Sequence, residues 1–226
     1  MKDVDLLLKS SQVIQELCLS EFSAYVDAKT TPPAVYRGKG DIKLIVLGQD
    51  PTVNNSQLRK KVHVALLLNR SGGLKTYLQD ICSNLEISLE NNVYATNVLK
   101  NFFIEPPVKI QKKLPSFIKH IALFWIPLLL LEIEEYKEVP ILTLGEPILN
   151  CLAKTDQPLK IRDFWGYESP TSHNNNFQCL LAKDNVLNRE IFPFPHIHGL
   201  RHLFYREQFR AYITFVKTSC FMNSSR

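Results

Sequence analysis

Two short apolar segments, each followed directly by a glycine, constrain the fold of this chain more than any other feature of its sequence. Ile42 to Leu47 and Val139 to Leu144 are mostly branched aliphatic side chains, and they end in Gly48 and Gly145. A short apolar run without regular polar alternation is typical of a strand that is buried on both faces. Such a strand needs helices above and below it, so these segments favour a layered α/β protein.

Segments with helical spacing alternate with strand-like segments along the rest of the chain. Further strands are expected at residues 93–95 and 177–182, and the polar residues 173–176 are expected to form a surface turn. The helices are expected at residues 4–27, 74–85, 115–135, from Gly145 to about 153, and 203–218. This alternation predicts a three-layer αβα sandwich with a central, mostly parallel four-stranded sheet. We expect one domain over residues 1–226, in which residues 1–35 form an N-terminal helix and linker packed on the rest.

Composition restricts the possible partners and the cellular setting. The net charge of +5 favours a polyanionic partner. The 5 cysteines are scattered without a C-x-x-C pair, as in an intracellular protein with reduced thiols, whether cytoplasmic or nuclear. The most apolar run, Ile121 to Leu131, is too short to span a bilayer and contains Pro127, so it predicts a buried helix and no membrane partner. A monomer is expected.

In a parallel sheet, functional groups gather beyond the carboxyl ends of the strands. That rule selects four places: Gln49 and Asp50, Thr96 and Asn97, Gly145 and Glu146, and the segment His196–His202. Each has a simpler interpretation as well. Asp50 before a proline is typical of a turn or a helix N-cap. His196, His198 and His202 also fit a polar loop that caps the last helix, or three ligands of a metal ion.

Several of these segments together resemble the uracil-DNA glycosylase superfamily. Gly48–Pro51 resembles the water-activating motif of the family-1 enzymes, and Pro195–Leu200 resembles the superfamily's His-Pro-Ser-x-Leu motif. Between them, the segments similar to family-4 enzymes are Val93–Lys100 with Pro106 and Pro107, Leu142–Gly145, and Ile161–Asp163 with Gly166. The motifs follow in the same order from about residue 42 to residue 202.

The resemblance implies a DNA glycosylase that removes uracil or a related deaminated base after flipping it out of the DNA. In that scheme Asp50 orients a water and stabilises positive charge on the sugar, while neutral His196 donates a hydrogen bond to the departing base. Asn97 reads the polar edge of the base through its amide, and the Gln49–Asp50 turn holds the base through backbone N–H groups.

The resemblance also implies how DNA, double- or single-stranded, is held. Leu200 is the wedge that fills the vacated stack, and Arg201 lies near a phosphate. The basic groups Arg59–Lys61 and Lys109–Lys113, which we expect in loops, are candidates for salt-dependent phosphate contacts.

Four positions depart from the family pattern. Thr52 stands where family-1 enzymes have the tyrosine that excludes thymine, and Val53 replaces the histidine that follows it. Counting along the loop places His63 where an aromatic residue stacks on the base. His198, after Ile197, stands where a serine contacts the DNA backbone.

The cofactor expectation is negative. Asn101 and His120 occupy the two alignable positions of the family-4 cluster cysteines, so no iron–sulfur cluster and no metal are expected. Two alternatives stay open beside the glycosylase. One is a superfamily member that binds DNA or a nucleobase without turnover, and the other is a metal-dependent hydrolase built on His196, His198 and His202.

Overall fold

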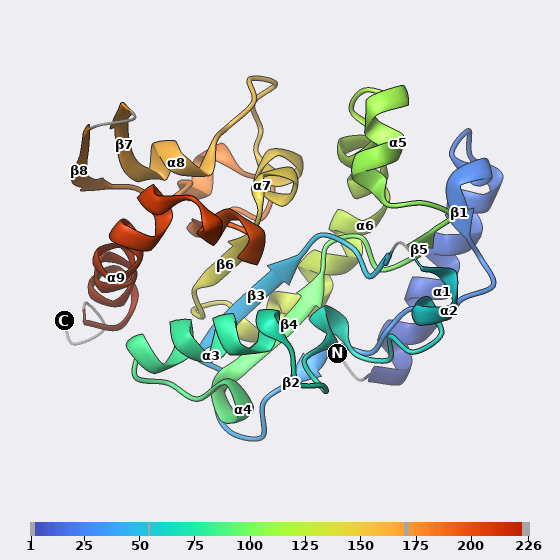
Figure 1. Ribbon diagram of the computed structural model, residues 1–226. Helices are drawn as coiled ribbons and strands as arrows, with labels where there is room; N and C mark the ends of the chain where they lie inside the picture. Colours follow the sequence, from blue (N-terminus) through green and yellow to red (C-terminus); the bar gives the residue numbers. More distant parts are fainter. Residues whose placement is uncertain (1–2, 54, 170–171, 223–226) are drawn as a thin grey trace.

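A five-stranded sheet forms the centre of the computed structural model, which describes residues 3–53, 55–169 and 172–222 (Figure 1). Four of its strands are parallel neighbours, and the fifth lies antiparallel at one edge. In spatial order they are β2 (Tyr36–Arg37), β4 (Val93–Asn97), β3 (Leu44–Gly48), β6 (Ile141–Leu144) and β9 (Ile191–Phe194). The predicted α/β sandwich with a mostly parallel sheet is confirmed, with β2 as an additional edge strand.

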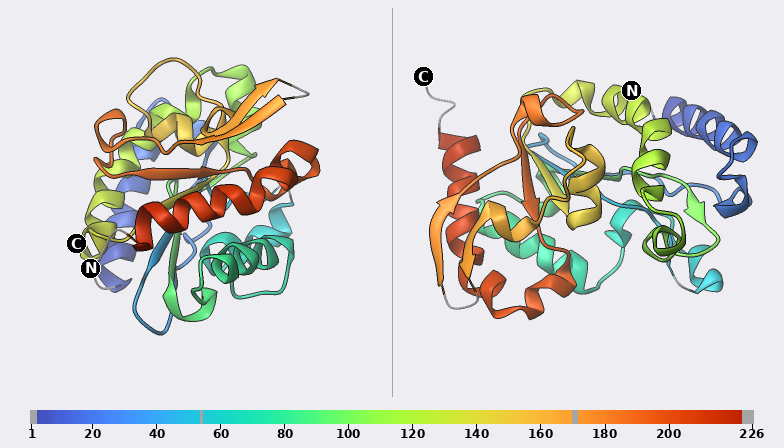
Figure 2. Two further views of the ribbon diagram at one scale, coloured as in Figure 1. Left: turned by 90° about the vertical axis from the view of Figure 1, so that its left-hand side faces the viewer. Right: turned by 90° about the horizontal axis from the view of Figure 1, so that it is seen from above.

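Helices cover both faces of this sheet (Figure 2). On one face α6 (Phe117–Ile133) packs against α1 (Asp3–Leu19), α5 (Pro107–Lys113) and α7 (Glu146–Leu152). On the other, α3 (Gly73–Asn84) packs against α9 (Leu203–Lys217). The short helices α2 (Ser56–Arg59), α4 (Leu89–Asn92) and α8 (Ile161–Phe164) lie in the connections. No helix in the described part of the chain combines the length and apolar character needed to cross a membrane.

The first helix is shorter than its spacing predicts. It ends at Leu19, because the Ser20 hydroxyl bonds the carbonyl of Leu17 and accepts from the N–H of Phe22. These local bonds compete with continuation of the helix. The chain then forms β1 (Val26–Asp27), which pairs with β5 (Phe102–Phe103).

The prediction of the fourth strand at residues 177–182 was wrong. Phe177 ends β8 (Ser172–Phe177), which forms a hairpin with β7 (Trp165–Ser169), so the predicted turn at residues 173–176 is a strand. The fourth parallel strand is β9, whose sequence is interrupted by Pro193. Proline lacks an N–H but is tolerated on an edge strand, and β9 lies at the edge of the sheet, beside β6; on its other side the described residues add one isolated bridge, Ile191 with Leu180. His196 is therefore the second residue beyond the end of a parallel strand.

The basic segment Lys109–Lys113 is also helical rather than a loop. It belongs to α5, which begins at Pro107. Proline suits the first position of a helix because its missing N–H has no intrahelical partner there. The pair Pro106 and Pro107 therefore starts a helix.

A buried ion pair joins the sheet to α6. Lys100 Nζ lies 2.5 Å from Glu132 Oε2, and both side chains are almost inaccessible. The same ammonium donates to Thr96 Oγ1 at 2.8 Å and to the carbonyl of Asn97 at 3.2 Å. Tyr94 donates its hydroxyl proton to Glu132 Oε1 at 2.8 Å. The carboxyl end of β4 is thereby held by charge as well as by its strand partners.

We predict that Lys100→Met lowers the free energy of unfolding by about 3 kcal/mol, because it leaves the Glu132 carboxylate buried without its counter-ion. Lys100→Met/Glu132→Gln should recover at least about 1 kcal/mol of this loss, since the amide keeps an acceptor for Tyr94 without a buried charge. Urea denaturation of the single and double variants measures both. A double variant less stable than Lys100→Met would contradict the assignment of the loss to an unpaired charge.

Candidate functional site

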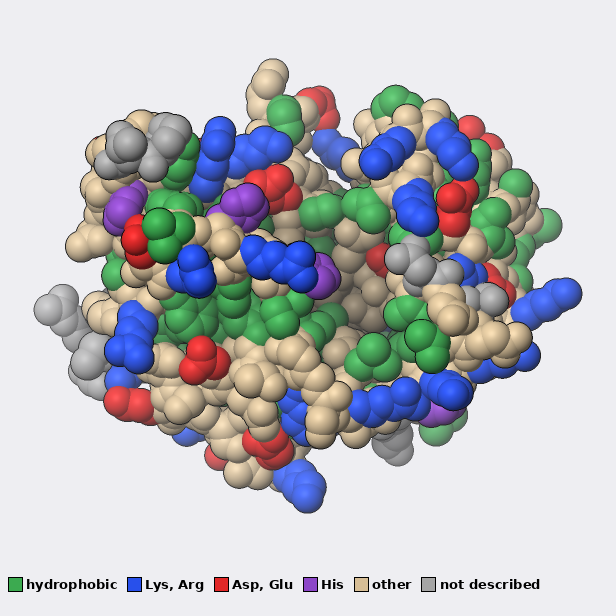
Figure 3. All heavy atoms as spheres, in the orientation of Figure 1, with side chains coloured by type: hydrophobic (Ala, Val, Ile, Leu, Met, Phe, Trp, Pro, Cys, Tyr) green, Lys and Arg blue, Asp and Glu red, His purple; other side chains and the backbone are tan. Residues whose placement is uncertain are grey.

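A pocket of about 470 Å³ opens beyond the carboxyl ends of β3, β6 and β9. That volume is typical of a small-molecule site. Figure 3 shows the face of the molecule on which a hollow lies between two raised parts, with basic side chains on both sides. The lining comes from the end of β3 and the loop after it, the segment before α3 and its first turn, the start of α5, the junction of β6 with α7, and the second residue beyond β9: Gly48–Val53, Val62, Leu66, Leu67, Leu74, Pro106, Val108, Leu144, Gly145, Pro147 and His196.

Asp50 is fixed by hydrogen bonds from its own loop. Gln49 Nε2 donates to Asp50 Oδ1 at 2.8 Å, and the backbone N–H of Thr52 donates to Oδ2 at 2.8 Å. The loop is tied to the end of β4, because the carbonyls of Gly48 and Gln49 accept from the N–H groups of Val98 and Leu99. The carboxylate therefore has a defined position at the pocket, and part of its surface still faces the opening.

Burial raises the pKa of Asp50 to about 6, although hydrogen bonds from Thr52 and Gln49 and the charge of Arg59 act in the opposite direction. Desolvation prevails because it penalises only the charged form. A carboxyl group with a pKa near 6 is ionised at neutral pH and remains a better proton acceptor than an ordinary aspartate.

Thr52 has a structural bond in addition to its place in the pocket. Its hydroxyl oxygen accepts from the N–H of Phe103 at 2.9 Å, which joins the Asp50 loop to β5. Arg59 strengthens the same junction: its guanidinium is buried, donates to the carbonyls of Val53 and Ile104, and lies 3.6 Å from Asp27. The expectation that Arg59 contacts phosphate is therefore wrong, because its donors are used inside the protein.

His196 lines the same pocket as Asp50 but belongs to the segment that follows β9. It precedes a short 3₁₀ turn, Ile197–Arg201, and its Nδ1 accepts from the N–H of His198 at 3.4 Å. That arrangement assigns the proton of the neutral ring to Nε2. His196 as a whole is exposed, but neighbouring protein atoms remove part of the water around its ring. This desolvation lowers the pKa of His196 below its ordinary value, and the charge of His198 acts in the same direction. His196 is therefore a neutral donor at neutral pH.

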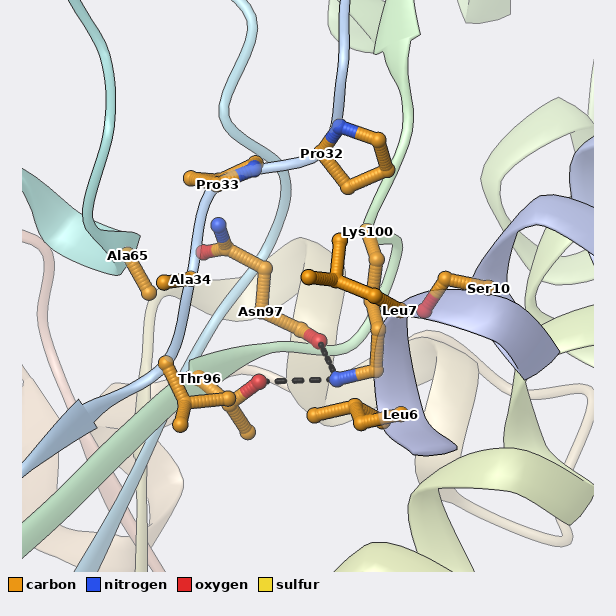
Figure 4. Close-up of a pocket in the computed structure, with 11 residues that line it drawn as sticks. Leu6, Leu7, Ser10, Pro32, Pro33, Ala34, Ala65, Thr96, Asn97 and Lys100 are labelled. Atoms are coloured by element: carbon orange, nitrogen blue, oxygen red, sulfur yellow. Dashed lines mark hydrogen bonds between the residues drawn. The ribbon is translucent and has the colours of Figure 1, made fainter. Parts of the chain in front are cut away.

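Asn97 lies at the end of β4, beside the pocket rather than in its lining. Its side chain is 2% exposed, and Figure 4 shows the amide directed toward Pro33 and Ala65. Together with α1, these residues enclose a second, much smaller pocket of about 40 Å³. The structure thus brings Gln49, Asp50, Thr52 and His196 together, and keeps the Asn97 amide covered.

The remaining predicted residues, His63, His198, Leu200 and Arg201, lie outside the described pocket lining. His63 is exposed and does not belong to the described pocket lining; its own loop contributes Leu66 and Leu67 instead. His198 and Arg201 are exposed on the turn after His196, and Leu200 is partly buried against the core. Leu66 and Leu67 are the residues that the sequence reasoning missed, because an apolar run such as residues 64–68 is typical of core packing.

The arrangement of His196, His198 and His202 does not match a metal site. Among the described residues, no group of three or more His, Cys, Asp or Glu side chains is placed to hold a metal ion. The rings of His196 and His198 lie 5.0 Å apart, but His202 lies against Tyr205. Asn101, at one of the positions of a family-4 cysteine, is buried: its Oδ1 accepts from Trp125 and its Nδ2 donates to the carbonyl of Phe102. These residues do not fit an iron–sulfur cluster.

No protein-family model matches this chain, and no curated protein matches it.

The raised pKa of Asp50 predicts a pH-dependent contribution to stability. An unperturbed aspartate has a pKa of 3.8, whereas Asp50 titrates at about 6 in the fold. The folded state therefore binds the proton more tightly, so this contribution is complete below about pH 4 and is lost as the pH rises through 6. Relative to Asp50→Asn, the free energy of unfolding of the wild type should fall by about 2 kcal/mol between about pH 4 and about pH 8.

Urea denaturation of both proteins across this range measures the difference. Asp50→Asn also loses one hydrogen-bond acceptor, but that loss is nearly constant with pH and does not change the slope. A difference that stays flat from about pH 4 to about pH 8 would contradict a raised pKa.

Proposed function

We propose that this protein is a DNA glycosylase that hydrolyses the N-glycosidic bond of uracil or a related deaminated base. The observation that supports it most is the pairing of Asp50 and His196 across one pocket, with an acid of raised pKa and an imidazole of lowered pKa. Groups whose environments shift their pKa values away from the ordinary range are typical of catalytic sites.

Asp50 acts on the sugar and on water. Cleavage of an N-glycosidic bond develops positive charge on the sugar, which a fixed carboxylate stabilises. The hydrogen bonds from Gln49 and Thr52 hold the carboxylate in place before the reaction begins. No reorganisation is then needed as the charge appears. The carboxylate also orients the attacking water and accepts its proton.

His196 acts on the departing base. The base leaves with negative charge on a carbonyl oxygen, and the Nε2–H of a neutral imidazole donates a hydrogen bond to it. Because desolvation and His198 keep the ring neutral, the donor needs no proton from solvent. The two residues thus stabilise opposite charges at the two ends of the breaking bond.

DNA reaches the pocket across a surface with exposed cations. Lys60 and Lys61 precede the pocket residue Val62, Lys109 follows Val108, and Arg201 lies on the turn after His196. Contacts of this kind are sequence-independent and weaken with salt. The enzyme is expected to act as an intracellular monomer.

A nucleobase- or DNA-binding protein without turnover is the second candidate. The covered amide of Asn97 favours DNA binding without turnover, because the base-reading group is not presented to the pocket in this conformation. Both candidates predict salt-dependent DNA binding, so only release of a free base separates them.

We predict that Asp50→Asn and His196→Ala each slow the single-turnover release of uracil from a uracil-containing oligonucleotide by at least about 10²-fold. Alkaline cleavage at the abasic product and gel electrophoresis measure the rate. The wild-type rate should rise with pH through about 6, as Asp50 ionises, and then level off. The affinity for DNA, measured by fluorescence anisotropy, should change less than about threefold in either variant.

Glu207→Gln is a matched control, since this exposed carboxylate of α9 lies outside the pocket lining. Tight binding with no release of uracil, hypoxanthine, xanthine or mismatched thymine by the wild type would replace the glycosylase with the binding protein.

We predict that Leu200→Ala slows excision from duplex DNA at least about tenfold more than from single strands. Unstacking a base from a duplex costs roughly a few kcal/mol, and a wedge offsets that cost only where a stack exists. Single-turnover rates on matched duplex and single-stranded oligonucleotides test this. Equal slowing on both would mean that Leu200, which packs partly against the core, acts through the fold instead.

A further inference from the structure

The amide of Asn97 is buried without a hydrogen-bond partner. Asn97 is only 2% exposed, and neither its Oδ1 nor its Nδ2 forms a hydrogen bond with another group in the described part of the chain. Buried polar groups nearly always form hydrogen bonds, so a buried amide whose donor and acceptor are both unbonded needs an explanation. Its backbone is well held, because Lys100 Nζ bonds its carbonyl at 3.2 Å.

Leu66 covers this amide from the side of the Asp50 pocket. A Cβ atom built on Gly48 would lie 2.2 Å from Leu66 Cδ2 and 2.5 Å from Asn97 Oδ1. The leucine methyl group and the amide oxygen therefore share the small space above Gly48. Leu66 also lines the Asp50 pocket, whereas Asn97 lines the small pocket behind it. The side chain of Leu66 is thus part of the partition between the Asn97 amide and the larger pocket.

The backbone that carries Leu66 is strained. Leu66 and Leu67 both have φ of 56°, in the left-handed region that leucine rarely adopts. Strained residues of this kind persist only where their surroundings hold them, and they concentrate at ligand-binding sites. The strand end that carries Asn97 is fixed by the Lys100–Glu132 pair, whereas the Leu66 side chain is only partly buried.

We propose that Leu66 is a displaceable plug over a closed subsite for a planar heterocycle with adjacent donor and acceptor groups. When such a ligand enters from the Asp50 pocket, the leucine side chain leaves the space above Gly48 and the ligand edge pairs with the Asn97 amide. The pocket then extends continuously from Asp50 and His196 to Asn97. The identification of the ligand as a nucleobase rests on the proposed function; the plug rests on the covered amide and the strained leucine.

The plug has a consequence for selectivity. A ligand must displace a packed leucine, so its observed affinity is reduced by the fraction of molecules in which the subsite is open. Only a ligand that satisfies both the donor and the acceptor of Asn97 recovers this loss. An apolar ring of the same size gains no hydrogen bond in return, and the plug discriminates against it.

Binding of free uracil, measured by calorimetry, tests the plug. Leu66→Gly removes the side chain and accepts φ of 56° without strain, so it should bind uracil at least about tenfold more tightly than the wild type. Adding Asn97→Ala to Leu66→Gly should abolish this gain. Glu86→Gly is the matched control: Glu86 also has a left-handed φ, of 59°, but lies outside the pocket lining, so its affinity for uracil should equal that of the wild type.

A measurement on the wild type makes the test independent of how well the variants fold. The methyl signals of Leu66, assigned by comparison with Leu66→Ala, should shift in NMR spectra as uracil is added. The side-chain amide signals of Asn97 should shift with the same dependence on uracil concentration. Uracil binding that leaves both sets of signals unmoved would overturn the plug.

Excision assays run in parallel separate this proposal from the glycosylase. If the wild type excises uracil but Leu66→Gly binds free uracil no more tightly than the wild type, the plug is wrong and the glycosylase stands. If nothing is excised but the gain in Leu66→Gly depends on Asn97, the plug stands on a base-binding protein. If neither wild type nor Leu66→Gly binds uracil, the plug falls.

Discussion

Parallel pairing of β3 with β4 places Gly48 opposite Asn97, and the site depends on that register. It brings the Asp50 loop next to the end of β4, where two backbone hydrogen bonds join them. The Lys100–Glu132 pair then anchors the carboxyl end of β4 to α6. On the other side, β6 pairs with β9 in parallel, which brings His196, the second residue beyond β9, to the same edge. A shift of one residue in either register would turn alternate side chains to the other face and separate these groups.

At one edge of the sheet the pKa of an acid and that of a base shift in opposite directions, because desolvation penalises the charged form of each. Asp50 lies in a loop enclosed by apolar pocket walls, so burial disfavours its charge and raises its pKa. The same penalty on the charged form lowers the pKa of His196, and the neighbouring His198 acts in the same direction. Desolvation alone therefore moves an acid and a base toward each other around neutral pH. The residues that line the pocket therefore help to set the pKa values of Asp50 and His196.

The sequence predicted the sheet and the neighbourhood of Asp50 and His196, because buried parallel strands leave a strong apolar pattern and functional groups follow their ends. It misplaced the last strand, since Pro193 interrupts the pattern of β9 while the region from Phe177 imitates a strand. The burial of Arg59 was not predictable either, because its partners, Asp27, Val53 and Ile104, come from distant or irregular segments. The sequence did not indicate the left-handed conformation of Leu66. A left-handed leucine looks in sequence like any other core leucine.

Several unfavourable features of this fold lie close to one another. A carboxyl group that resists ionisation, two left-handed leucines and an amide without a partner all lie within the loop after β3, the segment before α3 and the end of β4. A few residues away, an ion pair and a hydrogen bond join Glu132 to Lys100 and Tyr94. Sequences tend to be locally consistent except where function requires otherwise. Strain beside a well-anchored strand end is therefore better explained by a ligand that relieves it than by poor packing. The unpaired donor and acceptor of Asn97 describe what that ligand must carry.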